Sequence, residues 1–97
     1  MTEAEINLAI AKLEYPNLNW FSDGHLAVNW KDGCMTEYDY LHWADIGPII
    51  ECEKLTLGCN DTYGTYFAHD GYGNFTAFAE TPTKAAALCY LKMKGVE

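Results

Sequence analysis

The pattern of hydrophobic and polar positions begins with a helix close to the first residue of the sequence. Ile6, Ile10 and Leu13 recur at spacings of four and three residues, which places them on one face of a helix. Thr2 and the acidic residue at position 5 have the spacing of a capping box, and acids suit the positive end of a helix dipole. Pro16 ends the predicted helix.

The pattern then changes to that of short strands. Residues 19–21 are predicted to form one strand, and a cluster of turn residues at 22–24 separates it from the next. Residues 26–30 alternate between large apolar and smaller or polar side chains, which indicates a half-buried strand. Residues 34–42 mix acidic with aromatic side chains and show no period, so we expect an exposed loop there.

A second, shorter helix is predicted over residues 45–53. Asp45 suits the cap position, and Pro48 is expected in the first turn, where its missing N–H costs nothing. The apolar face of this helix consists of Ile46, Ile49 and Ile50. The period then switches to that of a strand, because Leu55 and Leu57 alternate with polar residues.

A hairpin and a final helix complete the predicted elements. Residues 63–69 and 75–79 are predicted as paired strands, and the two glycines within residues 70–74 suit the turn between them. The last helix is capped by Thr81, has a proline at its first position and ends before Gly95. Its inward face consists of Ala85, Leu88 and Leu91.

These elements predict an α+β fold for the 97 residues of the chain. Helices and strands follow one another without a repeat, a linker or a low-complexity segment, so we expect one small domain over residues 1–97. An antiparallel sheet of about four to five strands would need its apolar face covered, and two or three helices are available to cover it.

The charge distribution narrows the classes of function. The sequence has 14 acidic residues against six lysines and no arginine, a net charge of −8. Because proteins grip nucleic-acid phosphates with clustered Lys and Arg, we expect no direct binding of nucleic acid. Residues 14–80 alone carry a net charge of −9. This one-signed stretch suits either solubility or docking to a basic protein partner.

The apolar segments and the cysteines indicate a compartment. No stretch is long and apolar enough to span a membrane, and the acidic first residues lack the basic start of a signal peptide. We therefore expect reduced thiols, packed as small core residues, at Cys34, Cys52, Cys59 and Cys89. Neither these cysteines nor the three histidines show the close spacing of a metal site, so no metal or other cofactor is predicted.

Two blocks of the sequence resemble the NinX-like proteins, a family of small tailed-phage and prophage proteins of unknown function. One block runs from Tyr40 to Glu51 and continues into Lys54–Leu57, and the other runs from Thr81 to Tyr90. The resemblance covers roughly residues 40–97. It implies a phage or prophage origin, the cytoplasm of a bacterial host and a short helix–sheet–helix sandwich. It implies no chemistry and no functional residues.

An enzymatic interpretation has little sequence support. His69 and Asp70 could act as an acid–base pair, but no nucleophile motif accompanies them, and Asp commonly opens a turn. The oxygen-bearing residues within positions 70–74 lack the length and the closing Glu of a calcium loop. We therefore predict that the protein is not an enzyme. The alternative is a small enzyme or small-molecule binder that uses His42, His69 or Asp70 in a pocket.

The leading hypothesis is a non-enzymatic, acidic protein that binds and inhibits a host factor. A basic nucleic-acid-binding cleft would suit an acidic inhibitor, as with anti-CRISPR and other anti-defence proteins of phages. This step is an analogy of class and not a deduction from a motif. The predicted partner-binding surface mixes acids and aromatics: Asp23, Asp32, Glu37, Tyr38, Asp39 and Tyr40.

Overall fold

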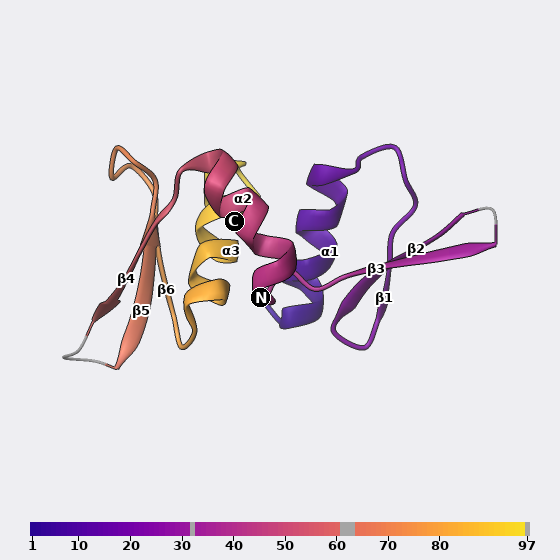
Figure 1. The fold of residues 1–97 in the computed structure, drawn as a ribbon, viewed down its shortest axis with the longest axis horizontal. Helices are drawn as coiled ribbons and strands as arrows, with labels where there is room; N and C mark the ends of the chain where they lie inside the picture. The colour runs from indigo at the N-terminus through magenta and orange to yellow at the C-terminus, as the bar shows by residue number, and fades with distance from the viewer. Residues whose placement is uncertain (32, 61–63, 97) are drawn as a thin grey trace.

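The computed structural model describes residues 1–31, 33–60 and 64–96, with the side chain of Lys31 left out. The molecule is elongated, with extents of 47 × 24 × 22 Å. Three helices fill its middle and a sheet lies at each end (Figure 1). In chain order the elements are α1 (Glu3–Glu14), β1 (Phe21–Asp23), β2 (Leu26–Lys31), β3 (Cys34–Tyr38), α2 (Trp43–Glu53), β4 (Thr56–Asn60), β5 (Thr65–His69), β6 (Thr76–Ala79) and α3 (Pro82–Met93).

The α+β class is confirmed, but the strands form two sheets instead of the single sheet that the sequence predicted. Strands β1, β2 and β3 pair in order as one antiparallel sheet, and β4, β5 and β6 pair in order as another. Helix α1 packs against β2 and β1, while α3 packs against all three strands of the second sheet. Each sheet therefore has a helix of its own to cover its inner face, and α2 lies between the two halves (Figure 1).

The predicted caps of the first and last helices are confirmed. The N–H of Glu5 donates to the Thr2 hydroxyl at 3.2 Å, and the N–H of Thr2 donates to the Glu5 carboxylate at 3.0 Å, so α1 begins with a capping box. At α3, Thr81 accepts from the N–H of Lys84 at 3.3 Å, and a proline occupies the first turn. These local signals decide where the two helices begin, independently of tertiary packing.

The core lies around α3. This helix is buried on nearly every side, because the second sheet covers one face and α1 and α2 cover the other. Small side chains allow that close approach. The fully buried residues of the helix are Ala85, Ala86, Ala87, Cys89 and Leu91.

Residues 34–42 are not the loop that the sequence predicted. Residues 34–38 form β3, which pairs with β2 from Ala27↔Tyr38 to Lys31↔Cys34. The side chains of residues 34–37 are all exposed. Because none of them has to be apolar for burial, the strand lacks the alternation of apolar and polar residues that would predict it. Backbone pairing with β2 stabilises this strand, and a period search has no signal for it. The first strand also lies slightly later than predicted, at Phe21–Asp23.

The beginning of α2 differs from the prediction as well. The cap is His42, whose ring nitrogen accepts from the N–H of Ala44 at 3.3 Å, and Asp45 lies inside the first turn. Pro48 therefore falls in the helix interior. Having no N–H, it leaves the carbonyl of Ala44 without the usual helical donor. No helix in the described part of the chain is long and apolar enough to cross a membrane.

Candidate functional site

The six predicted partner-binding residues do not form one surface. Asp23 and Glu37 are exposed on the amino-terminal sheet, but Tyr40 is buried and only 2% exposed. Tyr38 and Asp39 are half-buried. Asp32 lies outside the described residues. The alternation of β3 explains this dispersal, because successive side chains of a strand point to opposite faces.

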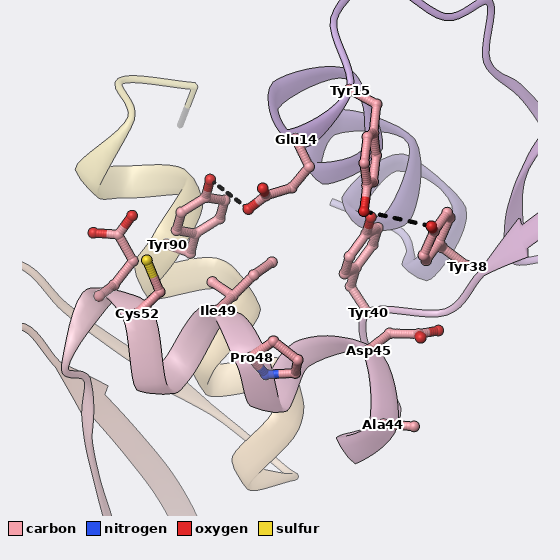
Figure 2. A pocket seen from close by; sticks show the side chains of 11 residues that line it. Glu14, Tyr15, Tyr38, Tyr40, Ala44, Asp45, Pro48, Ile49, Cys52 and Tyr90 are labelled. Carbon is pink, nitrogen blue, oxygen red and sulfur yellow. Dashed lines mark hydrogen bonds between the residues drawn. The ribbon is translucent and has the colours of Figure 1, made fainter.

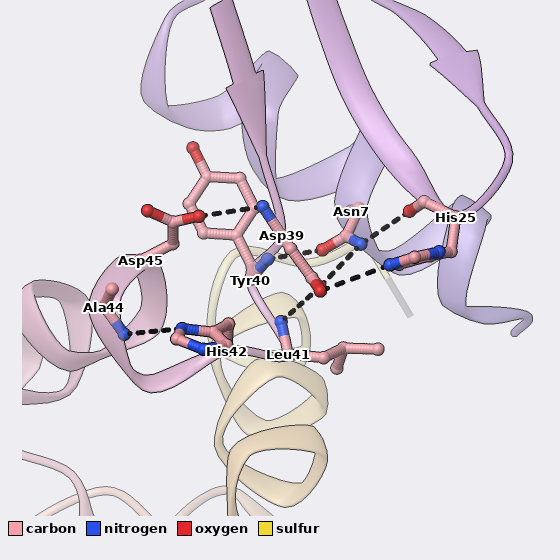
Figure 3. A network of polar contacts seen from close by, with 8 residues as sticks. All are labelled: Asn7, His25, Asp39, Tyr40, Leu41, His42, Ala44 and Asp45. Atoms are coloured by element: carbon pink, nitrogen blue, oxygen red, sulfur yellow. Dashed lines mark hydrogen bonds and ion pairs between the residues drawn. The ribbon is translucent and has the colours of Figure 1, made fainter.

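Asp39 belongs to a polar network that holds the fold together (Figure 3). One carboxylate oxygen accepts from the Asn7 side chain and from the N–H of Leu41, both at 3.1 Å, and the other lies 3.3 Å from the His25 ring. The N–H of Asp39 donates to the Asp45 carboxylate at 2.8 Å. Asp39 therefore joins α1, β3 and α2, and its side chain is half-buried instead of standing on an exposed loop.

Asn7 lies at the centre of that network. Its side chain is fully buried, donates to the carbonyl of His25 at 2.6 Å and accepts from the N–H of Tyr40 at 2.6 Å. A buried amide of this kind is tolerated because its donors and acceptor are satisfied. The network fixes the position at which the chain leaves β3 and enters α2.

The outward face of the amino-terminal sheet is the first candidate binding surface, here called the hairpin face. Its strand positions share one side of the sheet in the register, with Phe21 opposite Val28, Val28 opposite Glu37, and Trp30 opposite Met35. Phe21 and Met35 are each 49% exposed, and Trp30 is 60% exposed. The face consists of Phe21, Asp23, Leu26, Trp30, Met35 and Glu37 around Val28, whose side chain is fully buried.

The hairpin face combines exposed aromatic side chains with carboxylates and no basic residue. Asp23 and Glu37 are its two charged members, and both are exposed. Strands β2 and β3 extend well beyond α1, so the face projects from one end of the molecule (Figure 1). The mixed acidic and aromatic surface predicted from the sequence is therefore present, but Phe21 and Trp30 supply its aromatic rings instead of Tyr38 and Tyr40.

A cleft of about 390 Å³ is the second candidate, here called the tyrosine cleft. Its walls come from the end of α1, the end of β3, α2 and α3 (Figure 2). Four tyrosines and three carboxylates line it, and none of the lining residues is basic. The lining residues are Glu14, Tyr15, Tyr38, Tyr40, Ala44, Asp45, Pro48, Ile49, Cys52, Glu53 and Tyr90.

Three of the tyrosine rings stack along one wall. The centroid of Tyr38 lies 5.5 Å from that of Tyr15 and 5.5 Å from that of Tyr40, with interplanar angles of 26° and 8°. The hydroxyl of Tyr38 donates to that of Tyr15 at 3.4 Å. The hydroxyl groups of these tyrosines converge at this wall (Figure 2).

The opposite wall carries a hydrogen bond and an ion pair. The Tyr90 hydroxyl donates to the Glu14 carboxylate at 2.9 Å. The ammonium of Lys94 lies 3.3 Å from the Glu53 carboxylate and 5.5 Å from the centre of the Tyr90 ring. One of the three carboxylates is thus neutralised by a lysine of the same chain. Glu14 and Asp45 form no ion pair with any described residue.

Three of the tyrosines of the cleft, Tyr38, Tyr40 and Tyr90, keep their protons well above neutral pH. The hydrogen bond with Tyr15, and then burial, raises the pKa of Tyr38 to about 12. Burial is the main cause of a raised pKa at Tyr40 and at Tyr90, and the hydrogen bond to Glu14 adds to it at Tyr90. Each hydroxyl is therefore a neutral donor or acceptor and not a nucleophilic phenolate at physiological pH.

The residues of the alternative, enzymatic hypothesis have structural contacts instead. His42 caps α2. Asp70 is 6% exposed, and its carboxylate accepts from the N–H groups of Asn74 and Phe75 at 2.7 and 3.2 Å, which confirms the turn interpretation. The His69 ring lies 2.6 Å from the carbonyl oxygen of Asp70 and stacks on Phe67. His42, His69 and Asp70 are not among the residues that line the cleft.

The cysteines are not the four buried residues that the sequence predicted. Cys34, Cys52 and Cys59 are exposed thiols, and Cys89 alone among them is buried. Burial raises the pKa of the Cys89 thiol. Over residues 1–31, 33–60 and 64–96, no three His, Cys, Asp or Glu side chains gather into a group that could hold a metal ion.

Sequence reasoning missed the tyrosine cleft because its residues come from distant parts of the chain. Glu14 and Tyr90 are 76 positions apart, and no local spacing links them. Comparison with known proteins finds no matching protein-family model, no matching curated protein and no matching solved structure. The resemblance to NinX-like proteins therefore stays a prediction, and the function has to be argued from the two candidate surfaces.

Proposed function

We propose that this protein is a non-enzymatic phage or prophage accessory protein that binds a basic host protein through the hairpin face. The observation that supports the proposal is the presence of exposed Phe21 and Trp30 on the same face as Asp23 and Glu37. Aromatic side chains anchor protein interfaces, and carboxylates around them favour a positively charged partner. The proposed place of action is the cytoplasm of the bacterial host.

The outer face of the second sheet offers an internal comparison. Phe78 is 59% exposed there, and its ring lies 6.4 Å from that of Phe67. The strand positions on that face are Thr56, Gly58, Asn60, Thr65, Phe67, His69, Thr76 and Phe78, and none of them is acidic. Because exposed aromatic residues are present at both ends of the molecule, the carboxylates distinguish the hairpin face as the surface for a basic partner.

Binding variants should separate the two faces. Tagged protein is used to capture partners from bacterial lysate, a captured protein is identified and purified, and its association is then measured directly. We expect Trp30→Ala to abolish capture at the hairpin face and Phe78→Ala to leave it unchanged. If Trp30→Ala binds the purified partner as well as the natural chain does, the hairpin face is not the interface.

The charge of the face is tested through the association rate. Glu37→Lys should slow association with the purified partner, and the rate should fall as salt is raised, because the Debye length shrinks from about 10 Å at 0.1 M to about 3 Å at 1 M. Glu51→Lys, an exposed change of equal charge on α2, is the matched control and should have a smaller effect. Equal effects of the two variants would mean that the carboxylates of the hairpin face contribute only to net charge and solubility, and not to a specific interface.

Inhibition of the partner, as distinct from binding to it, can be tested by competition with nucleic acid. If the protein occupies a basic nucleic-acid-binding cleft, an oligonucleotide that binds the partner should compete with it. Simultaneous binding of both to the partner would contradict inhibition by occupation of that cleft. An anti-defence role, of the kind that anti-CRISPR proteins have, follows only if the identified partner belongs to a defence system.

A further inference from the structure

We infer that the tyrosine cleft binds the guanidinium group of an arginine side chain presented by the basic partner. This inference rests on the proposed function only for the source of the arginine, because the cleft and the hairpin face share no residue. The cleft volume of about 390 Å³ lies at the lower end of the range for ligand pockets. This volume accommodates one long side chain, and the three carboxylates of the lining disfavour the phosphate of a nucleotide.

An unpartnered hydroxyl is the observation that points to a ligand. Tyr40 is 2% exposed, and its hydroxyl oxygen is the one buried side-chain N or O atom without a hydrogen-bond partner in the described part of the chain. Leaving such a group unsatisfied is unfavourable. The ring rises from the connection between β3 and α2 and directs this hydroxyl to the upper part of the cleft wall (Figure 2). A donor N–H from outside the chain would satisfy it.

The charged residues that line the cleft determine the sign of the charge that a ligand should carry. The Glu14 carboxylate accepts one hydrogen bond from Tyr90, and the Asp45 carboxylate accepts one from the N–H of Asp39. In each case the other oxygen accepts nothing further from the described residues. Two negative groups with spare acceptor capacity, and no nearby lysine paired with either, favour a cation with several N–H donors.

The chain already shows this kind of recognition at one end of the cleft. The Lys94 ammonium lies against the Tyr90 ring and the Glu53 carboxylate, which combines a cation–π contact with an ion pair. The acceptors on the same side of the cleft are those of Glu14 and Tyr40, while the Asp45 carboxylate is directed to the other side of the Tyr40 ring (Figure 2). A planar guanidinium has five donors in a fixed fork and stacks on aromatic rings, whereas an ammonium is a compact point charge. Arginine therefore fits the unoccupied acceptors better than lysine.

The inference is tested with blocked amino acids and the intact protein. The probe is N-acetyl-arginine N-methylamide, and the matched probes are the lysine and citrulline derivatives, citrulline being the uncharged analogue of arginine. Titration followed by amide NMR shifts should give roughly millimolar affinity for the arginine probe. We expect shifts at residues of the cleft and affinity at least about tenfold weaker for citrulline. Equal affinity for citrulline, or shifts confined to other regions, would overturn the inference.

Conservative variants locate the binding. Glu14→Gln keeps an acceptor for Tyr90 while removing the charge, and it should weaken the arginine probe at least about fivefold. Glu51→Gln makes the same charge change on an exposed part of α2 that does not line the cleft, and it should leave the affinity unchanged. If the two variants weaken binding equally, the probe responds to net charge and not to the cleft.

Tyr40→Phe provides a readout that a purely structural role would not give. Removing a hydroxyl that has no partner should leave the unfolding midpoint unchanged or higher, while the affinity for the arginine probe falls by about threefold to tenfold. A lower midpoint would show that the hydroxyl already has a partner, and would remove the basis of the inference. If Glu14→Gln and Tyr40→Phe bind the arginine probe as tightly as the natural chain does while partner capture is intact, the cleft inference fails alone. Trp30→Ala tests the proposed function without touching the cleft.

Discussion

The carboxylate of Asp45 accepts a hydrogen bond of 2.8 Å from the backbone N–H of Asp39 and so fastens the first turn of α2 to the end of β3. This bond lies between the two candidate surfaces. Glu37, two residues before Asp39, is on the hairpin face, and Tyr40, one residue after it, lines the tyrosine cleft. The position of each surface therefore depends on how firmly this short connection is held.

The stability of that connection can be measured by removing Asn7. Asn7→Ala leaves the N–H of Tyr40 and the carbonyl of His25 without their buried partner. At about 1–3 kcal/mol for each unsatisfied group, the free energy of unfolding should fall by about 2–4 kcal/mol. Chemical denaturation measures this change. Asn17→Ala, an exposed control, should shift the value by less than about 0.5 kcal/mol, and a comparable loss in both variants would contradict the central role of Asn7.

A second prediction concerns the close approach of Gly58 to Phe67 on the second sheet. A Cβ atom added at Gly58 would lie well inside contact distance of the Phe67 ring. Gly58→Ala should therefore lower the free energy of unfolding by about 1–3 kcal/mol. In a Phe67→Ala background the same change should be nearly neutral, which a double-mutant cycle would show as coupling.

Gly47 is the matched control for that experiment. It lies within α2, and an added Cβ would meet no atom within 4 Å. Gly47→Ala should raise the free energy of unfolding by about 0.5–1 kcal/mol, because alanine restricts the unfolded chain and favours a helix. If Gly58→Ala is equally stabilising, the ring of Phe67 does not cover Gly58 in solution.

The beginnings of the first and last helices could be predicted from the sequence, whereas the beginning of α2 and the arrangement of the strands could not. Thr2 and Thr81 satisfy donors within three residues of themselves, so their signals are local. The division into two sheets depends on which helix covers which strands, and no spacing in the sequence records that choice. The exposed strand β3 has no buried face, so periodicity, the main signal for a strand, is absent from it.

The residues of the candidate surfaces could also be predicted from the sequence only in part. Residues 37–40 are predicted from the sequence to lie on one exposed surface because acids and aromatics mix there without a clear period. In the structure Glu37 faces outward, Tyr38 stacks between two rings, Asp39 joins a polar network and Tyr40 is buried. Composition indicates that acids and aromatics share part of the surface, but only the tertiary contacts show which of these residues are exposed.

A third prediction follows from the raised pKa of Tyr38. The pKa rises from 10.0 to about 12 in the folded protein, so the folded state holds this proton more tightly than the unfolded chain does. Its contribution to stability is complete below pH 10 and is lost as the pH rises from 10 to about 12. Urea unfolding across that range should show stability falling with pH. Tyr38→Phe should fall less steeply, and an identical slope would show that another group is responsible.

A fourth prediction concerns the thiols. In the folded protein a thiol reagent should modify the three exposed cysteines rapidly and Cys89 slowly, because Cys89 is buried and burial raises its pKa. After denaturation without reductant, all four thiols should react. Cys89→Ala should remove the slow phase alone. Fewer than four reactive thiols in the denatured natural chain would mean that a disulfide forms in solution.

The last prediction is that the protein does not bind single-stranded DNA or RNA at physiological salt. The one cluster of cations that could contradict the net charge of −8 lies on and after α3, at Lys84, Lys92 and Lys94. Each of these ammonium groups already has a partner in the structure. Lys84 pairs with Glu80 at 2.9 Å, Lys92 donates to the carbonyl of Thr76 at 2.8 Å, and Lys94 lies 3.3 Å from Glu53.

The measurement must separate stacking from charge, because exposed aromatics such as Trp30 could stack on bases without any cation. Stacking alone would have to overcome the repulsion between an acidic protein and a polyanion, which is stronger at low salt. Fluorescence anisotropy with a labelled oligonucleotide should therefore show no micromolar binding at physiological salt, and lowering the salt should not create it. Binding that strengthens at low salt would reveal a basic patch. Binding that strengthens at high salt and is lost in Trp30→Ala would show that bases stack on the hairpin face, which would then not be the surface for a basic protein.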